Sequence, residues 1–339
     1  MDNSEKVNSS LQHVIKYEKS LYISSNNLQE FLRILDIKKK IVPNNDHVEI
    51  GFTIDRIGMV YTEIGDYKKA IDHFLKSLDI YKKLNDLICL SKCYERIGDC
   101  NYKLNDFKNS LEFHSKSLEI SKKIFKEMDP RLGQTHMNIG NCFLKLNKID
   151  QCLYYYEKSL KIFKKSLTEY HPLIATCMNN FGLAYYKLGD LKKSLEYLEK
   201  GLDIRLKVLP SSDMEITESF NSIGNCYFKM ENYKKAIEFY CKSVEDGRTV
   251  SLDNYSVIVP IYINIGESFF RLGDPIQAIG YYWKSMEIYK KVLNENHIDF
   301  ARLYDCFGVA YLQMGEVKRA QEFFALYKRI RDFNMLQKS

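Results

Sequence analysis

The sequence predicts an all-α fold, a solenoid of stacked antiparallel helix pairs. Two observations carry this prediction. Glycines recur at a fixed period, with one step of 40 residues followed by five steps of 42. Side chains at fixed offsets from those glycines are aromatic, small or suited to capping in nearly every period. A period of this length is typical of repeat arrays, in which one helix pair cannot bury its apolar face alone and must stack on its neighbours.

The glycines and two columns of side chains predict how the two helices of a pair meet. The glycines are Gly58, Gly98, Gly140, Gly182, Gly224, Gly266 and Gly308. Three residues later, Asn101 stands in one period and a ring in the other six: Tyr61, Phe143, Tyr185, Tyr227, Phe269 and Tyr311. Twelve residues later stand the small side chains Ala70, Ser110, Cys152, Ser194, Ala236, Ala278 and Ala320. Glycine and small residues allow two helix backbones to approach closely, and the ring fills the space beside them.

Capping residues predict where the helices begin. Eight residues after the glycine, five of seven positions carry Asp or Asn, the preferred N-cap residues. These positions are Asp66, Asp106, Lys148, Asp190, Asn232, Asp274 and Glu316. Asp274 precedes Pro275, a residue favoured at the first helical position. Asp129-Pro130 and His171-Pro172 mark the start of a first helix in the same way.

The repeats also predict the organisation of the chain. Residues 48–335 form an array of seven repeats, preceded by a degenerate helical capping repeat at 1–47 and followed by a tail at 336–339. End repeats are expected to be atypical because one face has no neighbour. In the fifth repeat, Asp246 and Gly247 predict an early end of the second helix and a break over 246–254. This break is either a hinge or insertion with a function, or drift tolerated in a surface loop.

Composition excludes several classes of function. The net charge is +6, with 50 basic and 44 acidic residues mixed along the chain, so no block predicts nucleic-acid binding. No stretch approaches the ~20 apolar residues of a membrane span. The polar N-terminus does not resemble a secretory signal. Nine scattered cysteines fit a reducing compartment. We expect a cytoplasmic protein with no nucleic-acid partner and no membrane insertion.

No motif for catalysis is present in the sequence. It contains no phosphate-binding loop, zinc-protease motif or nucleophile elbow. Cys89 and Cys93 share a helix face, but without a nearby histidine pair they indicate packing rather than zinc binding. His114 occupies an aromatic column, and no histidine has a nucleophile and a carboxylate at suggestive spacing. We therefore expect no enzyme activity, no cofactor and no metal.

The columns resemble the tetratricopeptide repeat (TPR), in stretches such as Ile57-Gly58-x-x-Tyr61-x-x-x-Gly65-Asp66-Tyr67-x-x-Ala70-Ile71. The resemblance covers about residues 48–335 and recurs in register. It implies a right-handed superhelix of stacked helix pairs. The repeats are longer than the usual 34 residues. They are similar to the kinesin light chain type in His171-Pro172-Leu173-Ile174-Ala175-Thr176, and to LGN-type cell-polarity adaptors in the step through Asn85-Asp86-Leu87.

The resemblance also implies a binding surface, a concave groove lined by the first helix of each pair. The residue two before the glycine is similar to the family's asparagine ladder, which hydrogen-bonds an extended peptide backbone. This column contains Arg56, Arg96, Asn138, Asn180 and Asn264, and the position after the glycine adds Asn141 and Asn225. Five residues after the glycine stand Lys103, Lys145, Lys187, Lys229 and Arg271. This basic column either favours an acidic partner or offsets helix dipoles near helix ends.

The sequence thus predicts a non-catalytic scaffold or adaptor that holds a peptide or helix of a partner protein in its groove. The expected setting is a larger complex. The candidates are motor, cortical and ciliary assemblies, which are associated with the cytoskeleton. The alternative is a ligand-gated regulator, similar to TPR receptors that sense short peptides. Such receptors usually carry an N-terminal output module, and residues 1–47 are short for one, which favours the adaptor.

Overall fold

The structure is a computed structural model, and it describes residues 3–42, 44, 46–244 and 255–336. Regular structure in these residues is entirely helical, with sixteen α-helices and one short 3-10 helix. The chain divides into two compact units, Met1–Thr168 and Glu169–Ser339. The predicted all-α fold of stacked helix pairs is confirmed within each unit.

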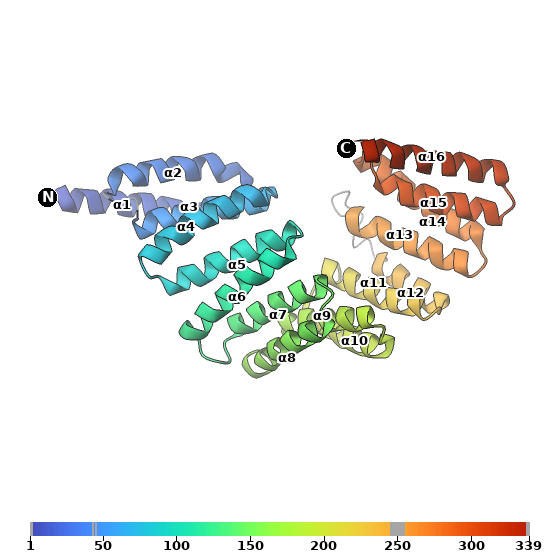
Figure 1. The fold of residues 1–339 in the computed structure, drawn as a ribbon, viewed down its shortest axis with the longest axis horizontal. Helices are drawn as coiled ribbons and strands as arrows, with labels where there is room; N and C mark the ends of the chain where they lie inside the picture. The colour runs from blue at the N-terminus through green and yellow to red at the C-terminus, as the bar shows by residue number, and fades with distance from the viewer. Residues whose placement is uncertain (1–2, 43, 45, 245–254, 337–339) are drawn as a thin grey trace. The chain divides into compact units, whose positions relative to one another are not determined.

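The first unit stacks its helices in chain order, shown in blue to green in Figure 1. They are α1 (Asn3–Ser20), α2 (Leu28–Ile41), α3 (Val48–Ile64), α4 (Tyr67–Lys83), α5 (Leu87–Lys103), α6 (Phe107–Ile124), α7 (Pro130–Lys145) and α8 (Ile149–Ser166). The 3-10 helix η1 (Ser25–Asn27) stands between α1 and α2. The closest packing joins α3 to α4, α5 to α6 and α7 to α8, which are the predicted pairs.

The second unit repeats this arrangement. Its helices are α9 (Pro172–Leu188), α10 (Leu191–Val208), α11 (Met214–Lys229), α12 (Tyr233–Val244), α13 (Tyr255–Arg271), α14 (Pro275–Val292), α15 (Asp299–Gln313) and α16 (Val317–Leu336). Each odd-numbered helix packs on the even-numbered helix that follows it. The predicted break at 246–254 lies outside the described residues. The domain boundaries at 47, 335 and 336 remain predictions.

Each repeat glycine faces a side chain sixteen residues further along, on the second helix of its pair. A methyl group placed on Gly140 would lie 2.5 Å from the ring of Tyr156, and one on Gly266 would lie 2.4 Å from the ring of Tyr282. The other partners are Phe74, His114, Leu198, Tyr240 and Phe324. Carbon atoms do not pack this closely. The glycines therefore make room for these side chains, a role that the sequence analysis did not predict.

Close approach of the two backbones is confirmed at the same glycines. A methyl group on Gly182 would lie 3.2 Å from the carbonyl oxygen of Ser194, and one on Gly266 would lie 3.0 Å from that of Ala278. Ser194 and Ala278 belong to the predicted column of small side chains and are fully buried. Small residues at this position allow the second helix to pack closely against the first.

The predicted ring column stacks on a second ring, fifteen residues after the glycine. Tyr185 lies 5.5 Å from Tyr197 with an interplanar angle of 15°, and Tyr311 lies 5.5 Å from Phe323 at 9°. Phe143–Tyr155, Tyr227–Phe239 and Phe269–Tyr281 stack in the same way. Aromatic contacts of this kind add about 0.5–1.5 kcal/mol to the burial of the rings. They join the two helices of a pair.

The predicted caps are also confirmed. The carboxylates of Asp66, Asp106, Asp190 and Asp274 each accept a hydrogen bond from the backbone N–H three residues later. Asp129 and the ring nitrogen Nδ1 of His171 cap first helices that begin with Pro. These bonds satisfy backbone donors that a helix leaves unpaired in its first turn.

A buried lysine joins the first three helices. Lys38 on α2 is fully buried, and its Nζ donates to Oε2 of Glu18 on α1 at 2.5 Å. The same nitrogen donates to Oε2 of Glu49 on α3 at 3.0 Å and to the Glu49 carbonyl oxygen at 3.2 Å. A buried charge is stable only when it is paired and hydrogen-bonded. The three helices are therefore held together by charge as well as by the packing of Ile15 and Phe31.

The small-residue column generates a prediction about stability. Changing Ala236 to Leu should overpack the contact of α12 with its neighbours and lower the free energy of unfolding by about 1–3 kcal/mol. Ala236 is fully buried beside Tyr240 and Ile261. The control is Lys234→Leu, on the exposed face of the same helix. Equal midpoints of urea unfolding for Ala236→Leu and the control would show that this position is not a close contact.

His114 generates a prediction about pH. Its side chain is 1% exposed, and burial lowers its pKa to about 4. In the unfolded chain the pKa of histidine is about 6.5. As the pH falls, the unfolded state therefore binds a proton at a higher pH than the folded state does. The stability due to neutral His114 is complete above pH 6.5 and is lost between pH 6.5 and 4, by at most about 3 kcal/mol.

The measurement compares His114→Phe with the parent, since Phe74 and Phe324 occupy the equivalent position. Urea unfolding at pH 7 and pH 4.5 should show a smaller loss of stability in the variant. His136, whose pKa burial also lowers to about 4, contributes to both proteins and cancels in the difference. Asp99, with Oδ1 at 3.5 Å from Nε2 of His114, reduces the effect if it pairs with the protonated ring. Equal losses in His114→Phe and the parent would contradict the prediction.

Candidate functional site

A groove runs along α3 and α5 in the first unit. Two adjoining cavities, of about 390 and 220 Å³, share Ile23, Met59 and Arg96 as lining residues. We call their combined surface the α3–α5 groove. It also receives side chains from α1, so its wall depends on the buried contact of Lys38 with α1 and α3. Both α3 and α5 are first helices of their pairs, which is where the sequence analysis predicted a binding surface.

Apolar side chains line part of this groove. Phe52 on α3 is 37% exposed, and Met59, seven residues or about two turns further on, is half-buried. Ile23 lies opposite, in the segment between α1 and η1. A pocket that combines apolar surface with a few polar groups is the usual form of a binding site. The α3–α5 groove has this composition.

Arg56 and Arg96, two of the predicted site residues, line the groove and are held in place. The Arg56 guanidinium donates to the carbonyl oxygen of Leu21 at 2.7 Å and lies 5.0 Å from the centre of the Phe31 ring. The Arg96 guanidinium forms an ion pair with Asp55 and lies 5.9 Å from the centre of the Phe74 ring. A guanidinium has five N–H donors, so each retains donors beyond these contacts.

Carboxylates are the main feature of the groove that the sequence analysis missed. The lining cations are Lys19, Arg56 and Arg96. The five lining carboxylates are Glu18, Glu49, Asp55, Glu63 and Asp99. Partial desolvation by the surrounding protein and the negative charge of the nearby Glu95 raise the pKa of Asp99 to about 7, although its side chain is 54% exposed. Asp99 follows Gly98 directly, in the column that also holds Asn141 and Asn225. The acidic residue in that polar column was therefore a signal in the sequence.

The predicted asparagines of the first unit already have partners. Asn138 donates from Nδ2 to Oδ1 of Asp99 at 3.5 Å, and its Oδ1 accepts from Gln134 at 3.0 Å. Asn141 accepts from the hydroxyl of Tyr156 at 2.7 Å. The bond from Asn138 to Asp99 joins the first helices of two successive repeats. Asn138 therefore links successive repeats, and Asn141 links the two helices of its own pair.

The second unit shows the same arrangement. Asn264 donates to Oδ1 of Asn225 at 3.3 Å and accepts from Arg302 at 3.4 Å, which links α11, α13 and α15. Oδ1 of Asn225 also accepts from the hydroxyl of Tyr240 at 2.7 Å. Asn180 is half-buried at the equivalent position of α9 and also has a partner. The structure brings Asn225 and Asn264 together, and a role in partner binding remains a prediction for all five asparagines.

The predicted basic column lies at the ends of first helices. Lys103, Lys145, Lys229 and Arg271 are the last residues of α5, α7, α11 and α13, and Lys187 is the last but one of α9. All five side chains are exposed. Lys229 donates to the carbonyl oxygen of Tyr186 at 3.2 Å. Cations at these positions offset the helix dipole, and their contact with an acidic partner remains a prediction.

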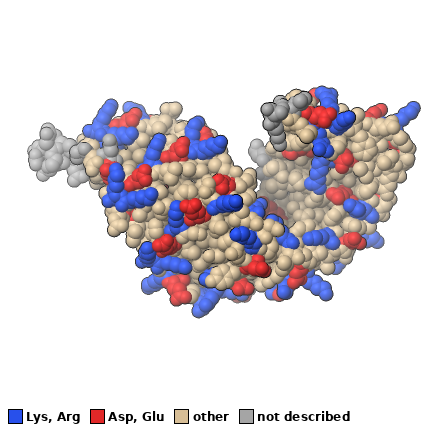
Figure 2. Space-filling model, viewed as in Figure 1, with Lys and Arg blue, Asp and Glu red and all other residues tan. Residues whose placement is uncertain are grey.

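Charge is otherwise evenly mixed on the face seen in Figure 2, where basic and acidic side chains alternate. Among the described residues, no group of three His, Cys, Asp or Glu side chains is placed to hold a metal ion. No helix in the described part of the chain is long and apolar enough to cross a membrane.

Solved structures with the same fold belong to several kinds of protein. The apo form of RapI has a TM-score of 0.64 at 17% identity, over 91% of this chain and 81% of that one. A STAND ATPase with a tetratricopeptide repeat sensor, from Pyrococcus horikoshii, has a TM-score of 0.62 at 20% identity, over 85% and 42%. The TPR-like repeats of a putative kinesin light chain from Podosopora anserina give 0.54 at 18%, over 61% and 98%.

Sequence comparison identifies the family. No curated protein sequence matches this chain. Sequence models described as tetratricopeptide repeat match residues 52–123, 131–207 and 258–331, and another of the same description matches residues 217–245. These matches cover most of the chain, and they coincide with the helix pairs described above. The chain therefore belongs to the tetratricopeptide repeat family.

Proposed function

We propose that this chain is a non-catalytic scaffold or adaptor that binds a segment of a partner protein in the α3–α5 groove. The observation that carries the proposal is the groove itself, where apolar side chains, exposed at Phe52 and half-buried at Met59, lie among arginines and carboxylates. Membership of the tetratricopeptide repeat family supports a partner that is a protein. We propose a larger cytoplasmic complex, such as a motor assembly, as the setting; the repeats of a kinesin light chain share this fold.

The groove offers three kinds of contact to such a segment. Phe52 and Met59 present apolar surface to an anchoring side chain. Arg56 and Arg96 keep N–H donors for carbonyl or carboxylate oxygens. Asp99 and Glu63 offer acceptors to donors or cations. A bound segment would gain most from the apolar anchor, because a few desolvated side chains carry most of the binding free energy in protein interfaces.

The asparagines and the basic column extend this proposal. An amide side chain has two donor hydrogens and an acceptor oxygen with two lone pairs. Asn138 therefore retains a donor hydrogen after its bonds to Asp99 and Gln134. We propose that this donor binds a peptide backbone, and that Lys103 and Lys145 at the ends of α5 and α7 contact acidic side chains of the same partner.

The groove generates a prediction about partner binding. Affinity capture with cross-linking mass spectrometry identifies the partner segment, and a peptide of that segment then serves as the probe. The double variant Phe52→Gln, Met59→Gln should weaken peptide binding at least about tenfold, because truncating a buried anchor costs more than 1 kcal/mol. Leu75→Gln is the matched control, a residue of α4 with 39% exposure that lies outside the groove. Equal affinities for the double variant and the control would rule out the groove as the site.

The columns generate a separate prediction, which depends on salt. Replacing Asn138, Asn180 and Asn264 with Ala should weaken partner binding by about 0.5–1.5 kcal/mol for each hydrogen bond lost, at any salt concentration. Reversing Lys145 and Lys187 to Glu should weaken binding strongly at low salt and less at high salt, if the partner is acidic. Circular dichroism and urea unfolding measure any loss of stacking in the first variant. Unchanged binding in both variants would exclude both columns from the interface.

A further inference from the structure

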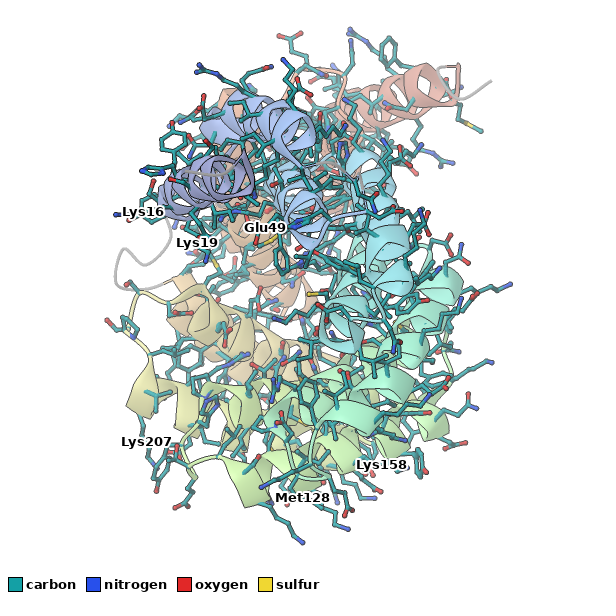
Figure 3. The ribbon with its side chains drawn as sticks, turned by 90° about the vertical axis from the view of Figure 1, so that its left-hand side faces the viewer. Lys16, Lys19, Glu49, Met128, Lys158 and Lys207 are labelled. Atoms are coloured by element: carbon teal, nitrogen blue, oxygen red, sulfur yellow. The ribbon has the colours of Figure 1, made fainter. Side chains whose placement is uncertain are left out.

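A different cavity lies in the first unit where α6, α7 and α8 meet. Its volume is about 360 Å³, and we call it the α6–α8 crevice. Met128 and Lys158, which belong to it, are labelled in Figure 3 at some distance from Lys19 and Glu49 of the α3–α5 groove. Phe125, Leu132 and Ile162 give it an apolar wall. Pockets for small molecules have volumes of ~300–1,000 Å³, so the crevice falls within that range.

Three lysines line the crevice: Lys122 on α6 and Lys158 and Lys161 on α8. Within the described part of the chain, none of the three has a carboxylate within ion-pair distance, and Nζ of Lys158 lies 4.3 Å from the centre of the Tyr154 ring. The nearby Lys123, by contrast, pairs with Glu119 on the same helix. Glu127 is the one carboxylate among the lining residues. The lining side chains of the crevice therefore carry three positive charges against one negative charge.

A buried histidine also lines the crevice. His136 on α7 is 5% exposed, and its Nδ1 has no hydrogen-bond partner in the described structure. Burial and the positive charges of Lys122 and Lys158 lower the pKa of His136 to about 4. An unsatisfied buried nitrogen costs stability that a bound ligand would recover. An anion would also relieve the repulsion from the lysines.

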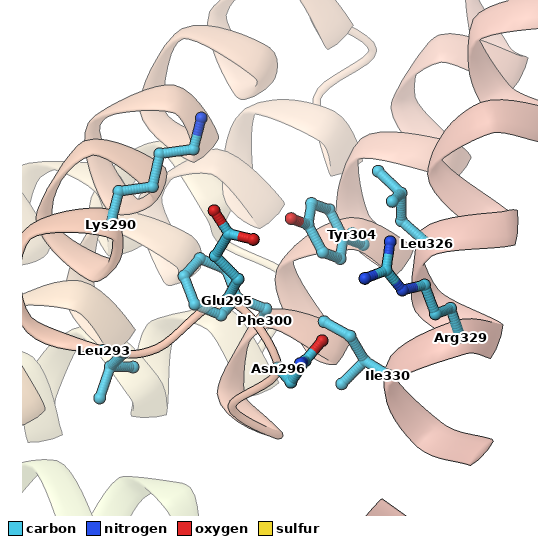
Figure 4. A pocket seen from close by; sticks show the side chains of 9 residues that line it. All are labelled: Lys290, Leu293, Glu295, Asn296, Phe300, Tyr304, Leu326, Arg329 and Ile330. Carbon is cyan, nitrogen blue, oxygen red and sulfur yellow. The ribbon is translucent and has the colours of Figure 1, made fainter. Parts of the chain in front are cut away.

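The second unit contains an equivalent crevice. Comparison of the two shows which lining residues the stacking of the helices requires. Its volume is about 480 Å³, and Lys290, Glu295 and Arg329 occupy the places of Lys122, Glu127 and Lys161. Each lies four periods of 42 residues further along the chain. Figure 4 shows Lys290 and Arg329 on opposite sides of it.

The crevices differ at several lining positions, and at two of these the α6–α8 crevice carries a lysine or a histidine. Leu326 stands in the place of Lys158, and Tyr304 in the place of His136. The helices stack with Leu and Tyr at these positions, so packing does not account for the lysine and the histidine. Their presence in the α6–α8 crevice adds a cation and an unsatisfied polar group to an otherwise similar cavity.

We propose that the α6–α8 crevice binds a small organic anion, a phosphate monoester or a carboxylate carried on an apolar group. The three lysines contact the anionic oxygens, and His136 forms a hydrogen bond with the ligand. The apolar part lies against Phe125, Leu132 and Ile162. This site is independent of the α3–α5 groove and of the partner proposed for it.

The test is titration calorimetry of the full chain at low salt, with phenyl phosphate and benzoate as anionic probes and benzyl alcohol as the neutral probe. At least one anion should bind saturably with a Kd below about 1 mM, and the tighter of the two identifies the preferred group. Benzyl alcohol should bind at least about tenfold more weakly. Absence of saturable binding by both anions up to about 10 mM, or equal binding of benzyl alcohol, would overturn the proposal.

Two pairs of variants locate the site. Lys122→Gln with Lys161→Gln should weaken binding at least about tenfold, because charge-assisted hydrogen bonds are the strong ones. The matched control, Lys123→Gln with Lys164→Gln, removes the same charge from the same two helices outside the crevice and should bind as the parent does. The exchange variant His136→Tyr with Lys158→Leu carries the residues that the second crevice has at these two positions. It should weaken anion binding as much as the Lys122 and Lys161 variant does. Equal losses in the control and the crevice variant would show a nonspecific charge effect and overturn the proposal.

The ring of His136 supplies a second readout, which does not depend on a variant folding correctly. In NMR titrations of the parent protein, saturating phenyl phosphate should move the His136 Cε1–H resonance and raise its titration midpoint, since a nearby anion stabilises the protonated ring. Glu127, Lys122, Lys158 and Lys161 are the other charged groups that line the crevice, and the centre of the Tyr155 ring lies 5.7 Å from that of His136, tilted by 40°. An unmoved His136 resonance under saturating ligand would place the anion elsewhere.

Discussion

The contact between each repeat glycine and the side chain sixteen residues later is the constraint on which the rest of the structure depends. At Gly140 and Gly266 a single added methyl group would overlap a tyrosine ring. Because the first helix has no side chain there, the ring enters and the second helix approaches the first. The stacked rings and the caps then fix the pair in one register. Every exposed column described above follows from that register.

Local sequence predicted the helix pairs because their determinants lie within one repeat. Gly266 and Tyr282 are sixteen residues apart, and Asp274 caps a helix that begins at the next residue. The groove could be predicted only in part, because its contacts join different repeats. Asp55 pairs with Arg96, and Asp99 with Asn138, across some forty residues. The column of Arg56 and Arg96 was visible in the sequence. The carboxylates around these arginines were not singled out, because a carboxylate contacts an arginine of another repeat only when successive first helices lie side by side.

Stacking gives every repeat the same scaffold, and substitutions at fixed positions give each cavity its own chemistry. The crevices at α6–α8 and at the end of the second unit share their apolar wall and one glutamate, yet differ at His136 and Lys158. Periodic alignment of the sequence brings such positions into register, but the sequence analysis did not single them out. The cavity is formed by residues from three helices, and a histidine at one of these positions is informative only once the neighbouring lysines are placed around it.

The buried contact of Lys38 has a practical consequence for truncation of the protein. A shortened chain that began at α2 would keep this ammonium group in the interior without Glu18, and one that began at α3 would leave Glu49 without its cation. Either truncation removes a partner from this ion-pair cluster, and in the first case Lys38 would retain only Glu49. Helices α1 to α3 therefore belong together in any shortened form of the protein, even though α1 and α2 lie outside the repeats that the glycines mark.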